Sequence, residues 1–250
     1  MVFRDRLAAT IALAILAACR TPAPPAAIDP ALSAHVPGPT VALAGVDLDR
    51  LRASPLYAKL PPAAQAFLQP FSRAHFVLVA YTGAGLLTIA RGVIPGAIQI
   101  APDLALSGAE SLIAAAIAAH PPAGILAPAE SVASARPIAP IWIAVHGAVA
   151  LPLEGNLSNL NNLLRDTEYV TLSVQPVDPT EIELVARCPT AAAALRFEQS
   201  LRAMVSLAAA TNARQPAMAG VLQSIRIRRE DRVVYVSLSS PLDPLTRLLL

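Results

Sequence analysis

The sequence predicts an α+β protein with two consecutive modules of antiparallel sheet plus helices, the first of them abbreviated. Three observations support this prediction. Hydrophobic residues make up 55% of the 250 residues and charged residues 14%, which leaves ample apolar material for a core. Short segments with the apolar–polar alternation of strands recur after residue 40. Segments of helical periodicity stand between them, and proline-rich stretches divide the chain.

The amino terminus has the features of a secretory signal. Residues 7–16 form an apolar run that is too short to span a bilayer as a mature helix, and two arginines precede it. The run ends in Leu16-Ala17-Ala18-Cys19, in which small residues stand before the cysteine. We therefore expect residues 1–18 to be a signal helix that is removed.

The sequence Leu16-Ala17-Ala18-Cys19 resembles the lipobox of bacterial lipoproteins. In that family the thiol is diacylated, the preceding peptide bond is cut and the new amino group is acylated. The resemblance therefore implies that Cys19 is lipidated and holds the protein in the cell envelope, facing the periplasm, since two acyl chains already give stable anchoring. Arg20, where an aspartate would favour inner-membrane retention, favours the outer membrane. A plain signal peptide followed by a chance thiol, or a frayed N-terminal helix, is the alternative.

Proline and alanine dominate residues 20–39, which lack hydrophobic periodicity and predict a disordered tether stiffened toward polyproline II. The predicted organisation is a signal peptide over 1–18, the lipidated cysteine and tether over 19–39, a first module over 40–120, a proline-rich connector over 121–140 and a second module over 141–250.

In the first module, residues 40–46 predict a strand, and Ser54 with Pro55 predicts the start of a helix that ends before Pro70. Two strands then flank Thr82-Gly83-Ala84-Gly85, which favours a hairpin turn. These two strands cover residues 76–81 and 86–91. The remaining elements of this module are an extended piece over 97–100 and an alanine-rich helix over 108–120.

The second module has the clearer pattern. It predicts a strand over 141–145, a helix over 157–165, a hairpin of strands 169–174 and 181–187, a long helix over 190–210, and two strands over 224–229 and 232–239. This element order resembles the ferredoxin-like, split βαβ arrangement with one extra edge strand. The mature chain also resembles uncharacterised predicted lipoproteins of soil bacteria in its Val46-Asp47-Leu48 and Ser54-Pro55-Leu56 segments and its arginine-rich terminal hairpin, a likeness that brings no activity with it.

No motif for catalysis, cofactor binding or metal binding occurs in the sequence. The histidines stand alone, at His35, His75, His120 and His146, and a structural role is expected for each. Carboxylates gather near two strands, at Asp47, Asp49, Asp178, Glu181 and Glu183, where strand ends and an outward strand face explain them. We therefore expect no catalytic residue, no cofactor and no metal, and a protein that is not an enzyme.

The second cysteine, Cys188, has no partner in the chain if Cys19 carries lipid. Strand alternation places Cys188 on the same face as Ile182 and Leu184, so we expect a buried and inert thiol. Arg226 and Arg228 alternate with isoleucines and are expected on a solvated face. A formal net charge of +2 with scattered arginines gives no reason to bind nucleic acid.

Three functions remain open at this point. The first expectation is a lipid-anchored, non-enzymatic scaffold or interaction module whose partner is another envelope protein. Its contact surfaces would be the terminal hairpin and Leu248-Leu249-Leu250. The alternative is a periplasmic binding module for a small or lipidic ligand, which requires a sizeable apolar cavity. An enzyme comes third.

Replacing Cys19 by Ala should release the protein from the membrane fraction or leave it unprocessed, because the acylated thiol is the expected anchor. Fractionation of the envelope, with immunodetection of the processed and unprocessed forms, measures this. Unchanged size and membrane association would refute the lipoprotein interpretation.

Overall fold

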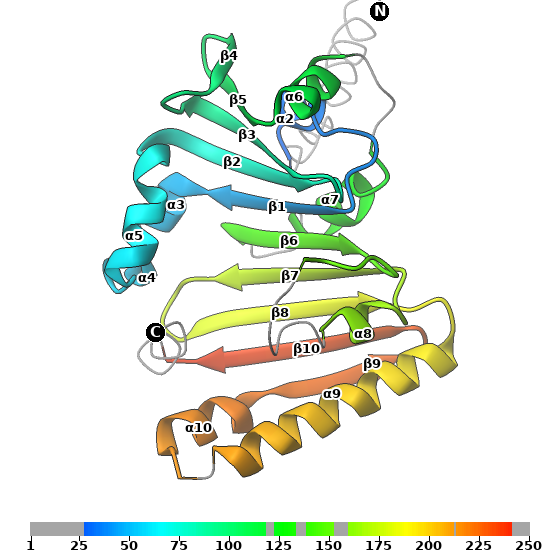
Figure 1. The fold of residues 1–250 in the computed structure, drawn as a ribbon. Helices are drawn as coiled ribbons and strands as arrows, with labels where there is room; N and C mark the ends of the chain where they lie inside the picture. Colours follow the sequence, from blue (N-terminus) through cyan, green and yellow to red (C-terminus); the bar gives the residue numbers. More distant parts are fainter. Residues whose placement is uncertain (1–27, 119–122, 134–138, 153–159, 213, 242–250) are drawn as a thin grey trace, which may run out of the picture.

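A single ten-stranded antiparallel sheet forms the centre of the computed structural model (Figure 1). The structure describes residues 28–118, 123–133, 139–152, 160–212 and 214–241. The predicted signal peptide, the lipobox residues Leu16, Ala17, Ala18 and Cys19, His120 and the C-terminal leucines lie outside the described residues. The strand order across the sheet is β4-β5-β3-β2-β1-β6-β7-β8-β10-β9.

The strands are β1 (Ala42–Asp47), β2 (Arg73–Tyr81), β3 (Leu86–Val93), β4 (Ile98–Ala101), β5 (Leu104–Gly108), β6 (Ile141–His146), β7 (Tyr169–Gln175), β8 (Thr180–Arg187), β9 (Arg226–Glu230) and β10 (Val233–Ser240). The helices are α2 (Pro30–Ser33), α3 (Leu48–Arg52), α4 (Pro55–Ala58), α5 (Pro62–Leu68), the 3-10 helix η1 (Gln69–Phe71), α6 (Glu110–Ile117), α7 (Leu126–Ala133), α8 (Leu160–Leu164), α9 (Ala191–Thr211) and α10 (Pro216–Ser224).

The two halves of the sheet repeat one strand order. Outward from the centre, the first half is β1-β2-β3-β5-β4 and the second is β6-β7-β8-β10-β9. Strands β1 and β6 join the halves by antiparallel pairing, with Ala44 opposite Ile143. The predicted α+β class with antiparallel sheet is confirmed. The ferredoxin-like order is not confirmed, because β6 and β7, which α8 connects, pair directly and antiparallel, whereas a split βαβ unit keeps another strand between them.

Strand alternation gives the sheet two faces with different covers. Face A, defined by Leu43 of β1 and Trp142 of β6, packs against α2, α6 and α7 in one core cluster. Face B, defined by Ile141 and Ile143 of β6, packs against α3, α4 and α5 in the first half of the sheet and against α8 and α9 in the second. Side chains of the two faces therefore belong to separate cores.

The predicted tether is too long by about a dozen residues, because residues 28–39 belong to the folded body. Asp29 caps α2, and Ile28, Leu32 and Val36 are buried in the face A core. Arg91 of β3 forms ion pairs with Asp29 and Asp103. The hydrogen bond from Arg91 lowers the pKa of the Asp29 carboxyl below its usual value, so this contact favours the folded position of α2 at neutral pH.

The predicted connector over 121–140 also contains a packed helix. In α7, Leu126, Ala129 and Val132 are buried against face A. Strand β5 and helices α3 and α10 were not predicted, and the helix expected after Ser54 is interrupted between Ala58 and Pro62. The other predicted strands and helices within the described residues are present, with ends that shift by a few residues.

Gly45 of β1 lies directly opposite Trp142 of β6, and a Cβ at Gly45 would lie 2.2 Å from Cζ2 of the indole. Gly45→Ala should therefore lower the free energy of unfolding by about 1–3 kcal/mol through overpacking. Gly38→Ala is the matched control, because no atom lies within 4 Å of its Cβ position. Urea denaturation measures both, and equal stability of the two variants would contradict this account of the centre of the sheet.

Candidate functional site

An apolar cavity of about 340 Å³ lies on face B of the second half of the sheet. Its floor comes from β6, β7 and β8, and its walls come from α9 on one side and from α8 with the loop after β6 on the other. The lining residues are Ile143, Val145, Leu151, Leu163, Leu164, Val170, Leu172, Leu184, Phe197 and Leu201. All ten side chains are hydrocarbon, and the volume falls within the range of small-molecule sites.

The α8 wall is fixed by hydrogen bonds to the loop that follows β6. The Asn161 side chain accepts from the Leu151 N–H at 2.9 Å and donates to the Leu151 carbonyl at 2.9 Å. Ala148, with φ of 59°, donates its N–H to the Leu164 carbonyl at 3.0 Å. A Cβ at Gly147 would lie 1.6 Å from the Thr167 carbonyl oxygen, so this turn requires glycine. Leu151, Leu163 and Leu164 are thereby held together as one wall.

The α9 wall is anchored at the start of the helix. Thr190 accepts from the Ala193 N–H at 3.1 Å, which caps the helix, and Phe197 is buried against the sheet. Arg196 forms an ion pair with Asp166, in the turn after α8, at 3.2 Å. Farther along, Leu201 is half-buried at the cavity. The two walls are therefore joined at one end by Arg196 and Asp166.

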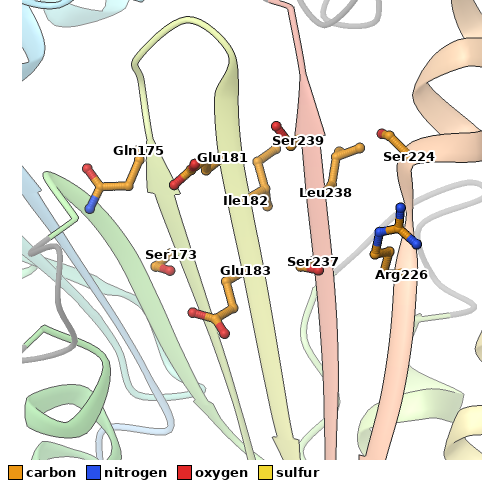
Figure 2. A pocket seen from close by; sticks show the side chains of 10 residues that line it. All are labelled: Ser173, Gln175, Glu181, Ile182, Glu183, Ser224, Arg226, Ser237, Leu238 and Ser239. Carbon is orange, nitrogen blue, oxygen red and sulfur yellow. The ribbon is translucent and has the colours of Figure 1, made fainter.

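Face A of the second half carries a polar surface instead. Figure 2 shows its side chains on β7, β8, β10 and β9, with Glu181 and Glu183 near the centre. Ser173, Glu183 and Ser237 lie directly opposite one another on neighbouring strands, and they line a shallow cavity of about 270 Å³. Neither glutamate forms an ion pair with a described residue. This surface therefore presents exposed hydrogen-bonding groups, Glu181, Glu183 and Ser237 among them.

The candidate residues from the sequence fall at separate places in the fold. His75 lies 2.9 Å from Asp49 at an exposed position, and the Nδ1 atom of His35 lies 2.8 Å from the Ala116 carbonyl oxygen. His146 ends β6, Asp47 caps α3, and Asp178 lies in the turn between β7 and β8. In the described part of the chain, no three His, Cys, Asp or Glu side chains are grouped to hold a metal ion.

The predicted orientations on the strands of the second half are confirmed. Glu181 and Glu183 are exposed, Arg228 lies over the Tyr235 ring at 4.3 Å, and Cys188 is fully buried. Burial raises the pKa of the Cys188 thiol to about 11. The thiol is therefore protonated at neutral pH.

The fold of this chain is similar to that of a protein of known structure, TP0453. Its crystal forms III and I each match with a TM-score of 0.53 and 8% identity, over 89% of this chain and 98% and 96% of theirs. At this identity the likeness concerns the fold alone. No family model and no curated protein matches the chain.

The cavity was not predicted from the sequence. Its residues have the alternation and the helical spacing of a packed core, so the sequence pattern predicts a filled core at this place. The unequal lengths of the predicted helices over 157–165 and 190–210 are the one sequence signal that the two walls of this face differ. No described helix is both long and apolar enough to cross a membrane.

Cys188 should react with a thiol reagent at least about a hundredfold more slowly in the folded protein than in denaturant, because burial and the raised pKa both suppress the thiolate. The measurement is the rate of reaction with dithiobis(nitrobenzoate) at pH 8. It uses the Cys19→Ala chain, in which Cys188 is the one remaining thiol. Comparable rates in the two conditions would mean that the thiol is accessible in the folded state.

Proposed function

We propose that this protein is a lipid-anchored, periplasm-facing cell-envelope protein that binds a small apolar or lipidic ligand between α8 and α9. The observation that carries the binding role is the cavity of about 340 Å³ whose ten described lining side chains are all hydrocarbon. The anchor rests on the lipobox sequence ending at Cys19. The two parts of the proposal are independent, since each has its own evidence.

Packing energetics support an occupant. The cavity opens to solvent on one side, so without a ligand its apolar side chains are left in contact with water. Water gains little there, because a stable water needs two to four polar partners and the lining supplies none from its side chains. An apolar ligand instead gains about 0.8 kcal/mol for each methylene that it buries.

Binding fits this cavity better than catalysis does. Acid–base and nucleophilic chemistry require a titratable or nucleophilic side chain within reach of the substrate, and the ten lining side chains include none. We therefore propose a non-enzymatic role.

The polar surface in Figure 2 favours a second candidate function, contact with another envelope protein. Ser173, Ser237 and the two glutamates, which form no ion pair with a described residue, present hydrogen-bonding groups on strands that are covered on face B. A partner that docks there would make the protein an interaction module. It would leave the apolar cavity untouched, because the cavity lies on the other face.

Leu201→Trp should weaken binding of the apolar fluorophore N-phenyl-1-naphthylamine at least about tenfold, because the larger side chain fills the cavity. Leu207→Trp is the matched control, since Leu207 lies on the same helix and is 67% exposed. Fluorescence titration of the original chain and both variants measures the affinities, and circular dichroism checks that each is folded. Equal affinities in all three chains, or no saturable binding by the original chain, would overturn the proposal.

A further inference from the structure

The geometry points to a single acyl chain of about a dozen carbons as the ligand, selected by its length and not by its polar head. This inference rests on the proposed function and adds the chemical class of the ligand. It follows from the volume of the cavity, the chemistry of its lining and the charges around it.

The volume sets the size of the ligand. An engineered apolar cavity of about 150 Å³ accommodates benzene, which has six carbons, so a cavity of about 340 Å³ accommodates roughly a dozen. A lipid with two long chains would need to bury more than twice that number of carbons. The cavity therefore fits one chain of medium length.

The lining determines which part of the ligand enters. Because the ten lining side chains carry no polar atom, a charged or hydroxyl group inside would lose its hydration without a side-chain partner. The polar head therefore stays at the open side of the cavity, in water. Only the hydrocarbon part is buried.

The charges on the α9 wall are already paired within the protein. On α9, Arg196 pairs with Asp166 at 3.2 Å and Arg202 pairs with Glu198 at 2.9 Å. Glu198 also accepts from Arg229 at 3.1 Å, and these two hydrogen bonds lower the pKa of its carboxyl. None of these groups is an unpaired charge that would select an anionic or a cationic head.

The position of the amino-terminal helix favours a separate lipid molecule over the protein's own anchor. The described chain begins at Ile28 and packs α2 onto face A, over the first half of the sheet. The cavity lies on face B, over β6, β7 and β8 of the second half. The described start of the chain and the cavity therefore lie on opposite faces of the sheet.

The experiment uses the Cys19→Ala chain, which carries no anchor lipid, and displaces N-phenyl-1-naphthylamine with two alkyl series below their micelle concentrations. One series is the fatty acids and the other the alkyltrimethylammonium ions, each from eight to sixteen carbons. Affinity should rise about fourfold per methylene, which corresponds to about 0.8 kcal/mol, and should level off near twelve to fourteen carbons. The two heads should give affinities within about threefold of each other at every length.

A cavity variant sharpens the test. Leu163→Ala widens the cavity at the α8 wall and should move the levelling point to chains about two or three carbons longer. Leu195→Ala removes the same atoms at a position that is 41% exposed, and it should leave the levelling point unchanged.

The outcomes separate the two proposals. If the fluorophore does not bind at all, the proposed function fails. If the fluorophore binds but affinity rises without a limit in length, or one head is preferred more than tenfold, the acyl-chain inference fails alone. If the fluorophore binds the lipid-free chain but not the lipidated protein, the anchor itself occupies the cavity, and the separate-lipid assignment is wrong.

Discussion

The antiparallel pairing of β1 with β6 is the constraint on which the rest of the structure depends. It joins two halves of equal strand order into one sheet. Its register, together with strand alternation, determines which side chains of the sheet point to face A and which to face B. The pairing places the indole of Trp142 over Gly45, where no side chain competes for the space. A shift of one residue would exchange the faces, so that Ile143 would replace Trp142 under α2 and α7.

The two halves differ in the described helices that cover face B. In the first half, α3, α4 and α5 lie in the connection between β1 and β2, and Leu48, Leu51 and Phe71 pack on face B there. In the corresponding connection of the second half the described helix is the five-residue α8, and α9 also packs on this face. Only the first part of α9 is buried, up to Phe197, so the two helices leave a gap over β6, β7 and β8.

The sequence was informative where one face of a strand meets water. Alternation in β7 and β8 correctly predicted the burial of Cys188 and the exposure of Glu183. It failed at β5, where Leu104, Ala105 and Leu106 are all buried and no alternation exists. Helices α2 and α7 were not predicted because their proline-rich segments are typical of a tether and a connector. Pro30 and Pro128 both fall in the first turn of a helix, where proline is tolerated. The cavity depends on the distance between α8 and α9, and residue pattern carries no information about that distance.

The candidate ligand site and the polar surface are two sides of the same strands. On β7, Leu172 faces the cavity and Ser173 faces the polar surface. On β8, Leu184 faces the cavity and Glu183 faces the polar surface. At the outer edge of this half, Arg202 of α9 donates to the Ile227 carbonyl at 2.8 Å on the edge strand β9. This contact occupies one backbone acceptor that a pairing strand from another chain would use. Since one layer of strands separates the two faces, a ligand that moves β7 or β8 on face B also moves the hydrogen-bonding groups that a partner would meet on face A.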